Sequence, residues 1–291
     1  MPSPKLIKTV LREMLTGERS IRVTEPDLVM NEPEHVKQYV AAGREDAVMA
    51  PVYLFHCANI CDVIRPGDTV LDLACGPANQ LAMVARLNPA TNFIGVDLSK
   101  NMLEEAQALI DEQGLKNVRF VERDISDLSI FADGSIDAVM STMALHHLPD
   151  LDTLKRTYAE VHRVLKADGG IYMVDFGHLK SPRSIDYFAN QYAHRQGPRF
   201  TLDYLNSLHA AFYRDDFKEA VQPLMGRAKL HATIGLPFMV ALKTPPRRTP
   251  EPALRATLAN MKKGLPERHR GDYSDLIFHF RLGGMKTHTL A

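Results

Sequence analysis

The sequence of 291 residues contains no tryptophan and only three cysteines. Three cysteines cannot build a framework of disulfide bonds, so a reducing, cytoplasmic location is expected. No apolar run approaches the length of a membrane span, and charges interrupt the apolar positions of the first 20 residues, unlike a signal peptide. Basic and acidic residues balance at 35 each, so the chain as a whole does not attract nucleic acid or anionic lipid electrostatically.

The chain does contain enough apolar sequence for a globular core, with 45% hydrophobic and 24% charged residues. From residue 67 onward, short β-branched runs alternate with segments of helical periodicity. The runs are TVLDLA, NFIGVDL, VRFVERD, IDAVMST and GIYMVDF. Strands separated by helices predict a parallel sheet with right-handed crossovers and helices on both faces.

Two of the helical segments have predictable ends. In SKNMLEEAQALIDEQG, Ser99 is the expected N-cap and Gly114 the expected stop. LDTLKRTYAEVHRVL carries one apolar stripe and is followed by ADGG. Gly169 or Gly170 is therefore expected to end that helix in the left-handed conformation.

Changes in the pattern of apolar and polar residues along the chain predict five segments. They are a helical N-terminal segment (1–66), a β/α core (67–177), a helical insertion (178–230), a β-hairpin that closes the sheet (231–245) and a helical C-terminal extension (246–291). No internal repeat and no low-complexity block is present.

The turn after the first expected strand, ACGPAN, indicates a nucleoside ligand. Parallel sheets bind ligands beyond the carboxyl ends of their strands. Gly76 permits close backbone approach there, and Asp97, at the end of the second strand, can accept hydrogen bonds from both hydroxyls of a ribose. A dinucleotide fits less well, because Ala74 and Ala78 stand where a pyrophosphate loop needs glycine, and Asp72 would repel a phosphate.

Five ordered motifs resemble those of class I S-adenosylmethionine-dependent methyltransferases. The similarity covers roughly residues 65–177 and is strongest to the branch of quinone-biosynthesis C-methyltransferases and small-molecule methyltransferases. The motifs are LDLACGPAN, GVDLSKNML, RFVERDISDL, DAVMSTMALHHLPD and AEVHRVLKADGGIYMVDF. The resemblance implies S-adenosyl-L-methionine as cofactor. It also implies an α/β fold with a Rossmann-like, doubly wound, seven-stranded sheet, its last strand antiparallel, an N-terminal helical lid and a helical substrate cover after the fifth strand.

The resemblance also implies individual cofactor contacts. Asp72 would lie near the methionine amino group, Asp97 would bind the ribose, and Asp124 would bind the adenine amino group. The full set of implied cofactor-binding residues is Tyr53, Asp72, Ala74, Gly76, Asp97, Leu98, Met102, Asp124, Ile125 and Ser141. For the acids, the alternative role is capping of local turns; for Tyr53 and Met102, it is packing.

Methyl transfer from a sulfonium is an in-line displacement with a neutral leaving group, so alignment and exclusion of water supply most of the catalysis. A base is needed only where the acceptor carries a proton at attack. The catalytic candidates are His146 and His147, directly after the fourth strand, and Asp175 and His178 follow the fifth strand at the same edge. The alternative is that these histidines only shape the pocket or bond a loop carbonyl.

The expected function is methyl transfer to a small-molecule acceptor. A nucleic-acid methyltransferase is the first alternative, because Lys243 to Arg270 contain eight Lys and Arg against two Glu. A catalytically idle scaffold protein and a nicotinamide oxidoreductase are further alternatives. Cys57, Cys61 and Cys75 give too weak a signal for a metal site, so no metal is expected. The sequence is compatible with a homodimer but does not define the acceptor atom or the oligomeric state.

Overall fold

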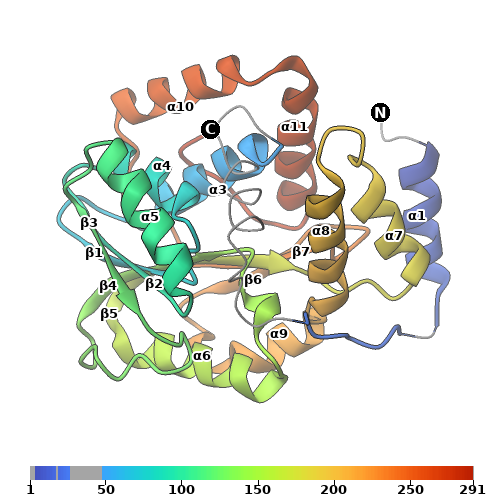
Figure 1. The fold of residues 1–291 in the computed structure, drawn as a ribbon, viewed down its shortest axis with the longest axis horizontal. Helices are drawn as coiled ribbons and strands as arrows, with labels where there is room; N and C mark the ends of the chain where they lie inside the picture. Colours follow the sequence, from blue (N-terminus) through green and yellow to red (C-terminus); the bar gives the residue numbers. More distant parts are fainter. Residues whose placement is uncertain (1–3, 18, 27–47, 291) are drawn as a thin grey trace.

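The computed structural model of the protein describes residues 4–17, 19–26 and 48–290. The rest of the expected N-terminal helical segment lies outside the described residues. A seven-stranded sheet forms the centre of the molecule (Figure 1). Its strands are β1 (Thr69–Leu73), β2 (Asn92–Asp97), β3 (Val118–Glu122), β4 (Ile136–Thr142), β5 (Leu165–Phe176), β6 (Lys229–Ala232) and β7 (Met239–Lys243).

The strand order is β3-β2-β1-β4-β5-β7-β6. The first five strands pair in parallel, and β7 lies antiparallel between β5 and β6. The order reverses between β1 and β4, which is where an open sheet of this kind binds ligands. The prediction of a doubly wound sheet closed by an antiparallel strand is confirmed.

Helices cover both faces of the sheet (Figure 1). One face carries α3 (Ala50–Val63), α4 (Asn79–Leu87), α5 (Lys100–Glu112), α10 (Pro252–Gly264) and α11 (Glu267–Leu282), and the other carries α6 (Leu151–Val164) and α9 (Arg214–Ala220). At one end lie α1 (Pro4–Leu15), α7 (Pro182–Asn190) and α8 (Pro198–Ala210). Short 3-10 turns occupy Leu145–His147 and Gln222–Leu224. Among the described residues, no helix is both long and apolar enough to cross a membrane.

The apolar runs of the sequence become strands buried on both faces. In β1, Val70 packs in the core beneath α3, whereas Leu71 and Leu73 pack in the core beneath α6. All three side chains are fully buried. Because successive side chains of a strand point to opposite faces, one short run supplies both cores.

The predicted helix ends are confirmed for α5 but wrong for α6. Ser99 caps α5 by accepting a hydrogen bond from the Met102 amide at 3.2 Å, and Gly114 follows its last turn at φ 65°. In contrast, α6 ends at Val164 and the chain continues directly into β5, with neither Gly169 nor Gly170 in the left-handed region. Gly170 instead lets β5 pass beneath α3, because an added Cβ would lie 2.0 Å from the Val63 carbonyl oxygen.

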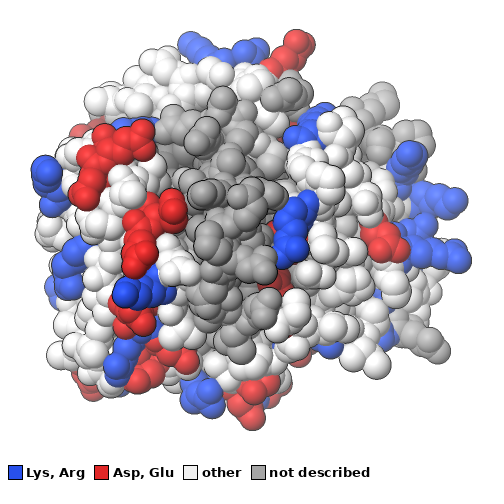
Figure 2. Space-filling model, viewed as in Figure 1, with Lys and Arg blue, Asp and Glu red and all other residues white. Residues whose placement is uncertain are grey.

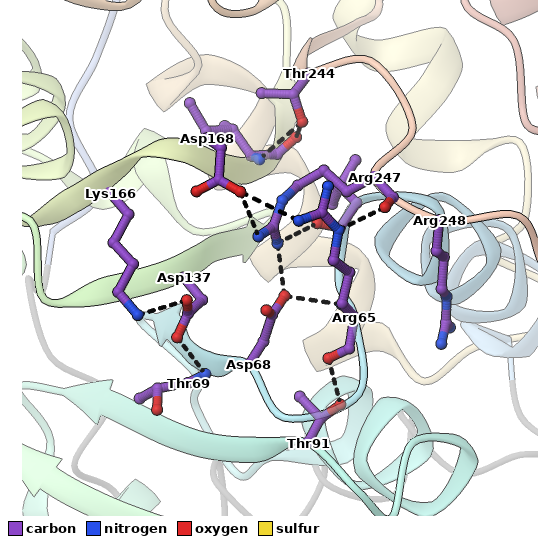
Figure 3. Close-up of polar contacts among 12 residues, drawn as sticks. Arg65, Asp68, Thr69, Thr91, Asp137, Lys166, Asp168, Thr244, Arg247 and Arg248 are labelled. Carbon is purple, nitrogen blue, oxygen red and sulfur yellow. Dashed lines mark hydrogen bonds and ion pairs between the residues drawn. The ribbon is translucent and has the colours of Figure 1, made fainter.

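The basic segment after β7 folds back onto the amino ends of the strands (Figure 3). Arg247 lies 2.5 Å from the Asp68 carboxylate, and both side chains are almost fully buried. Arg65 donates to the Arg247 carbonyl oxygen at 2.6 Å and pairs with the exposed Asp168 at 3.1 Å. Arg248 donates to the Cys61 carbonyl oxygen at 2.7 Å. These arginines therefore stabilise the junction between sheet, α3 and C-terminal extension.

Two acids of this network allow a matched test. Asp68→Asn removes the charge that balances buried Arg247, so we expect it to lower the free energy of unfolding by about 3 kcal/mol. Asp168→Asn removes an acid whose side chain is 68% exposed, and we expect a loss below about 1 kcal/mol. Urea unfolding of both variants measures the difference. Equal losses would show that burial does not set the strength of this network.

Candidate functional site

The turn between β1 and α4 has an unusual backbone. Ala74, Gly76 and Ala78 all have φ between 54° and 62°, in the left-handed region that favours glycine. The Cys75 amide donates to the Val96 carbonyl oxygen at 3.1 Å, which ties the turn to the end of β2. The turn thus presents its backbone at the point where the strand order reverses.

Two carboxylates lie beside this turn. Asp97 accepts hydrogen bonds from the Gly76 amide and the Ser99 amide, each at 2.8 Å. Asp72 is buried, and no described residue donates a hydrogen bond to it. Burial raises the pKa of Asp72 well above its usual value, and the nearby charge of Asp97 raises it further. A buried acid without a donor suits a ligand that brings a positively charged group.

A cavity of about 240 Å³ opens over the turn. Gln80 also lines it, and its buried Oε1 has no hydrogen-bond partner among the described residues. Nine of the residues expected to contact the cofactor line this cavity: Tyr53, Asp72, Ala74, Gly76, Asp97, Leu98, Met102, Asp124 and Ile125. These side chains come from α3 and from the carboxyl ends of three neighbouring strands, so the fold brings them together.

Two further expected contacts, like Asp97, have local partners in the structure. Ser141 does not line the cavity: it is fully buried, and its hydroxyl donates to the Leu73 carbonyl oxygen at 2.9 Å. Its neighbour Thr142 lines the cavity instead, because adjacent residues of a strand face opposite sides. Asp124 lines the cavity but also accepts a hydrogen bond from the Ser126 amide at 2.7 Å, so it holds its own turn.

A second cavity, of about 260 Å³, adjoins the first. Its wall is rich in apolar and aromatic side chains, among them Phe176, Phe188 and Phe238. Three residues line both cavities and mark the passage between them: Tyr53, Met143 and His147. A ligand in the first cavity can therefore be approached from an apolar chamber.

At the wall of the second cavity, His146 is held between two carboxylates. Its Nδ1 lies 2.7 Å from Asp175 Oδ1, and its backbone amide donates to Asp175 Oδ2 at 2.7 Å. Its Nε2 lies 3.6 Å from Glu25 Oε1. A carboxylate accepts hydrogen bonds, so Nδ1 carries the hydrogen and Nε2 of neutral His146 has a free electron pair. Burial opposes the imidazolium, but Asp175 and Glu25 outweigh burial and raise the pKa of His146.

Glu25 was not found by sequence reasoning. It follows Arg22, whose guanidinium donates to the carbonyl oxygens of His146 and Leu148 at 2.9 and 2.6 Å. The Glu25 carboxylate lies 3.1 Å from His147 Nδ1 and accepts from the Ser207 hydroxyl at 2.7 Å. Burial would raise the pKa of Glu25, but His147, His146 and Ser207 lower it to about 2. Its place is set by long-range contacts, for which the local sequence carries no signal.

Glu25, His146 and His147 also offer atoms suited to a metal ion. One nitrogen or oxygen from each lies within 4.8 Å of the others. Two imidazoles and one carboxylate form a set that binds several divalent metals. No comparable group surrounds the three cysteines in the described part of the chain.

Comparison with known proteins finds a methyltransferase domain in part of the chain. Residues 70–169 match the family model described as methyltransferase domain. Over 117 residues, 40% of this chain, the sequence is 33% identical to the demethylmenaquinone methyltransferase of Lactococcus lactis, of which 45% is covered. Over 114 residues, 38% of this chain, it is 36% identical to the 2-phytyl-1,4-naphtoquinone methyltransferase of a Nostoc species, of which 48% is covered. The chain thus spans about half the length of these curated relatives.

The fold is shared with solved methyltransferase structures. The plantazolicin methyltransferase, solved in complex with S-adenosylhomocysteine, superposes with a TM-score of 0.56 at 15% identity, covering 81% of this chain and 88% of that one. The strand order is that of a Rossmann-like fold, with the cavity at the point where the order reverses. Residues 70–169 thus resemble a methyltransferase domain, and S-adenosyl-L-methionine is the cofactor that this resemblance implies.

The residues of the first cavity fit this cofactor. Asp72 and Gln80 Oε1, neither of which has a donor among the described residues, can accept hydrogen bonds from its ammonium group, and Asp97 retains lone pairs for ribose hydroxyls after binding two amides.

Replacing Asp97, the acid expected to bind the ribose, should therefore weaken cofactor binding. We expect Asp97→Ala to lower the affinity for S-adenosylhomocysteine about 100-fold, because two charge-assisted hydrogen bonds are lost. Titration calorimetry measures the change. Asp111→Ala, on the exposed side of α5, removes the same charge and should leave the affinity unchanged. An unaltered affinity in folded Asp97→Ala would refute the ribose assignment.

Proposed function

We propose that this protein transfers a methyl group from S-adenosylmethionine to a bulky, largely apolar small molecule that loses a proton on reaction. One observation carries the proposal: the cavity suited to the cofactor joins an apolar cavity at Tyr53, Met143 and His147, beside the pair His146 and Asp175. Cofactor, acceptor and base would thus have adjoining places within one site.

The cofactor supplies, when bound, an electrophilic methyl group on a sulfonium that leaves as a neutral thioether. His146 Nε2 takes the acceptor's proton, and Asp175 fixes the imidazole so that this nitrogen points away from Asp175, toward Glu25 in the wall of the cavity. The carboxylates of Asp175 and Glu25 then stabilise the imidazolium. Tyr53 and Met143 narrow the passage and exclude water during transfer.

The wall of the second cavity supports an apolar acceptor. Aromatic rings line it, and Phe188 stacks on Phe238 with centroids 4.1 Å apart. The aromatic part of this wall suits planar rings and alkyl chains. The relatives named for demethylmenaquinone and 2-phytyl-1,4-naphtoquinone support an aromatic acceptor of the quinol type.

The structure offers less support for nucleic acid as the acceptor. Of the eight basic residues between Lys243 and Arg270, Lys243 is buried against Asp62 at 2.7 Å, and Arg247 and Arg248 bond α3 and the sheet. These three cannot reach phosphates without breaking the fold. Fewer basic residues therefore remain on α10 and α11 to contact a phosphate backbone, and electrostatic binding of nucleic acid would be weaker than the sequence alone suggests.

Transfer of a labelled methyl group tests the proposal directly. We expect transfer to an alkylated naphthohydroquinone, and none to the same ring with both hydroxyls blocked as methyl ethers, because the blocked ring has no acidic proton. Mass spectrometry of the product locates the methyl group. Transfer to tRNA but to no apolar hydroxyarene would overturn the proposal. Loss of activity after dialysis against EDTA would assign Glu25, His146 and His147 to a metal instead.

The pH profile tests the base. His146 acts as a base only when neutral, so kcat/KM should fall as the pH drops through its raised pKa. Asp175→Asn removes the charge that raises this pKa, so we expect the fall to move to lower pH while the plateau rate drops 10-fold or more, by roughly the contribution of a positioned base. His146→Gln should lose the acid limb altogether. An acid limb unmoved by Asp175→Asn would exclude His146 as the titrating base.

A further inference from the structure

Helix α1 is fixed to the rest of the protein along one side. The Glu13 carboxylate accepts hydrogen bonds from the Lys180 and Ser181 amides at 2.8 and 2.9 Å, directly before α7. Leu6 and Val10 pack against the apolar core and line the second cavity. Because this side is bonded and packed, the orientation of α1 is defined, and its opposite side faces outward.

The outward side is apolar. Ile7, Leu11, Met14 and Leu15 are 47, 52, 68 and 84% exposed. At 3.6 residues per turn these four form one continuous stripe, next to the buried stripe of Leu6 and Val10. Single exposed apolar residues are ordinary, but four on one helix form a patch that marks an interaction surface.

Three cations border the apolar stripe. Lys8, Arg12 and Lys5 follow Leu15 in order around the helix, and none of the three pairs with an acid in the described part of the chain. Figure 2 shows Lys and Arg side chains gathered at the edge of the molecule where α1 lies in Figure 1. A helix with an apolar stripe beside a cationic stripe has the form of a helix that lies in a membrane interface.

We propose that the outward stripe of α1 docks this protein onto an anionic lipid surface. Charge complementarity favours lipid over a second copy of the chain. A two-fold dimer through this face would bring the three cations of each copy together, whereas acidic headgroups would neutralise them. The helix would lie on the membrane without crossing it, since it has only 12 residues.

Docking would place the second cavity at the lipid surface. Leu6 and Val10 line that cavity from the inner side of α1, so one helix diameter, ~10 Å, separates it from the docked stripe. An acceptor with a long alkyl chain resides in the bilayer and would have a short path to the site. This benefit rests on the proposed function, whereas docking itself does not require methyl transfer.

Vesicle sedimentation with the full chain tests the docking. The vesicles contain equal parts phosphatidylglycerol and phosphatidylcholine, or phosphatidylcholine alone, and neither cofactor nor acceptor is added. We expect binding to the anionic vesicles that weakens with salt. A triple variant, Ile7→Ser, Leu11→Ser and Leu15→Ser, and a charge variant, Lys5→Gln, Lys8→Gln and Arg12→Gln, should each bind about tenfold or more weakly.

The matched control is Ile130→Ser, which removes an equally exposed apolar side chain from the β3–β4 connection, at the other end of the sheet. It should bind like the unaltered protein. The proposal would be overturned if the unaltered protein did not bind anionic vesicles, or if the triple variant and the charge variant both bound them as strongly as the unaltered protein. Concentration-dependent dimers that the triple variant abolishes would make a second copy the occupant. Methyl transfer to a short-chain, soluble hydroxyarene should be unchanged in the triple variant, so loss of docking and loss of activity are separate results.

Discussion

The site depends on one buried carboxylate. Asp175 is fully buried at the end of β5 and accepts hydrogen bonds from the backbone and side chain of His146 and from the Phe176 amide. An unpaired charge at this depth would cost several kcal/mol, so its donors are obligatory. Because they come from the loop after β4 and from β5 itself, Asp175 fixes the loop to the sheet and orients the imidazole in the same contact.

Arg22 extends this constraint to the N-terminal segment. Its guanidinium donates to four carbonyl oxygens, those of His146, Leu148, Pro149 and Ala210. The loop that Asp175 holds therefore also holds the segment that carries Glu25. A carboxylate, an imidazole and a second carboxylate thus line up from three distant parts of the chain. The arrangement lets a buried histidine be charged transiently, because both neighbouring acids favour the imidazolium.

The sequence predicted the parts of this molecule that local patterns determine. Apolar runs of strand length gave the sheet, and acids at strand ends, such as Asp72 and Asp97, converge because parallel strands end at one edge. Predictions failed where packing overrides the local signal. Gly170 looks like a helix stop but serves the close approach of β5 to α3. Ser141 lies one residue from a position that lines the cavity, and one residue in a strand changes the face.

A substrate cover was expected after the fifth strand, but Glu25 and the full wall of the second cavity could not be predicted, because both are assembled from segments far apart in the sequence. Val10 of α1, Phe188 of α7 and Phe238 before β7 meet only in the folded chain. Helices α1, α7 and α8 are amphipathic, and an apolar helix face can serve either core packing or ligand binding. Whether an aromatic side chain fills a core or lines a chamber depends on volume left between elements, which periodicity does not encode.

The backbone conformation of the turn between β1 and α4 affects which ligands the first cavity can bind. Alanine in the left-handed region costs roughly 1 kcal/mol, and Ala74 and Ala78 both adopt it. Glycine would remove that strain, and it would also free the loop to wrap a phosphate with its amides. Ala74 and Ala78 lie two residues before and after Gly76, and no described residue donates a hydrogen bond to Asp72. The pocket therefore disfavours a dianion sterically, and an ionised Asp72 would also repel it. A cation beside Asp72 would stabilise its ionised carboxylate, and the ammonium group of S-adenosylmethionine is such a cation. The strained turn and an acid that has no donor among the described residues would therefore both favour a nucleoside with positive charge over one with phosphate.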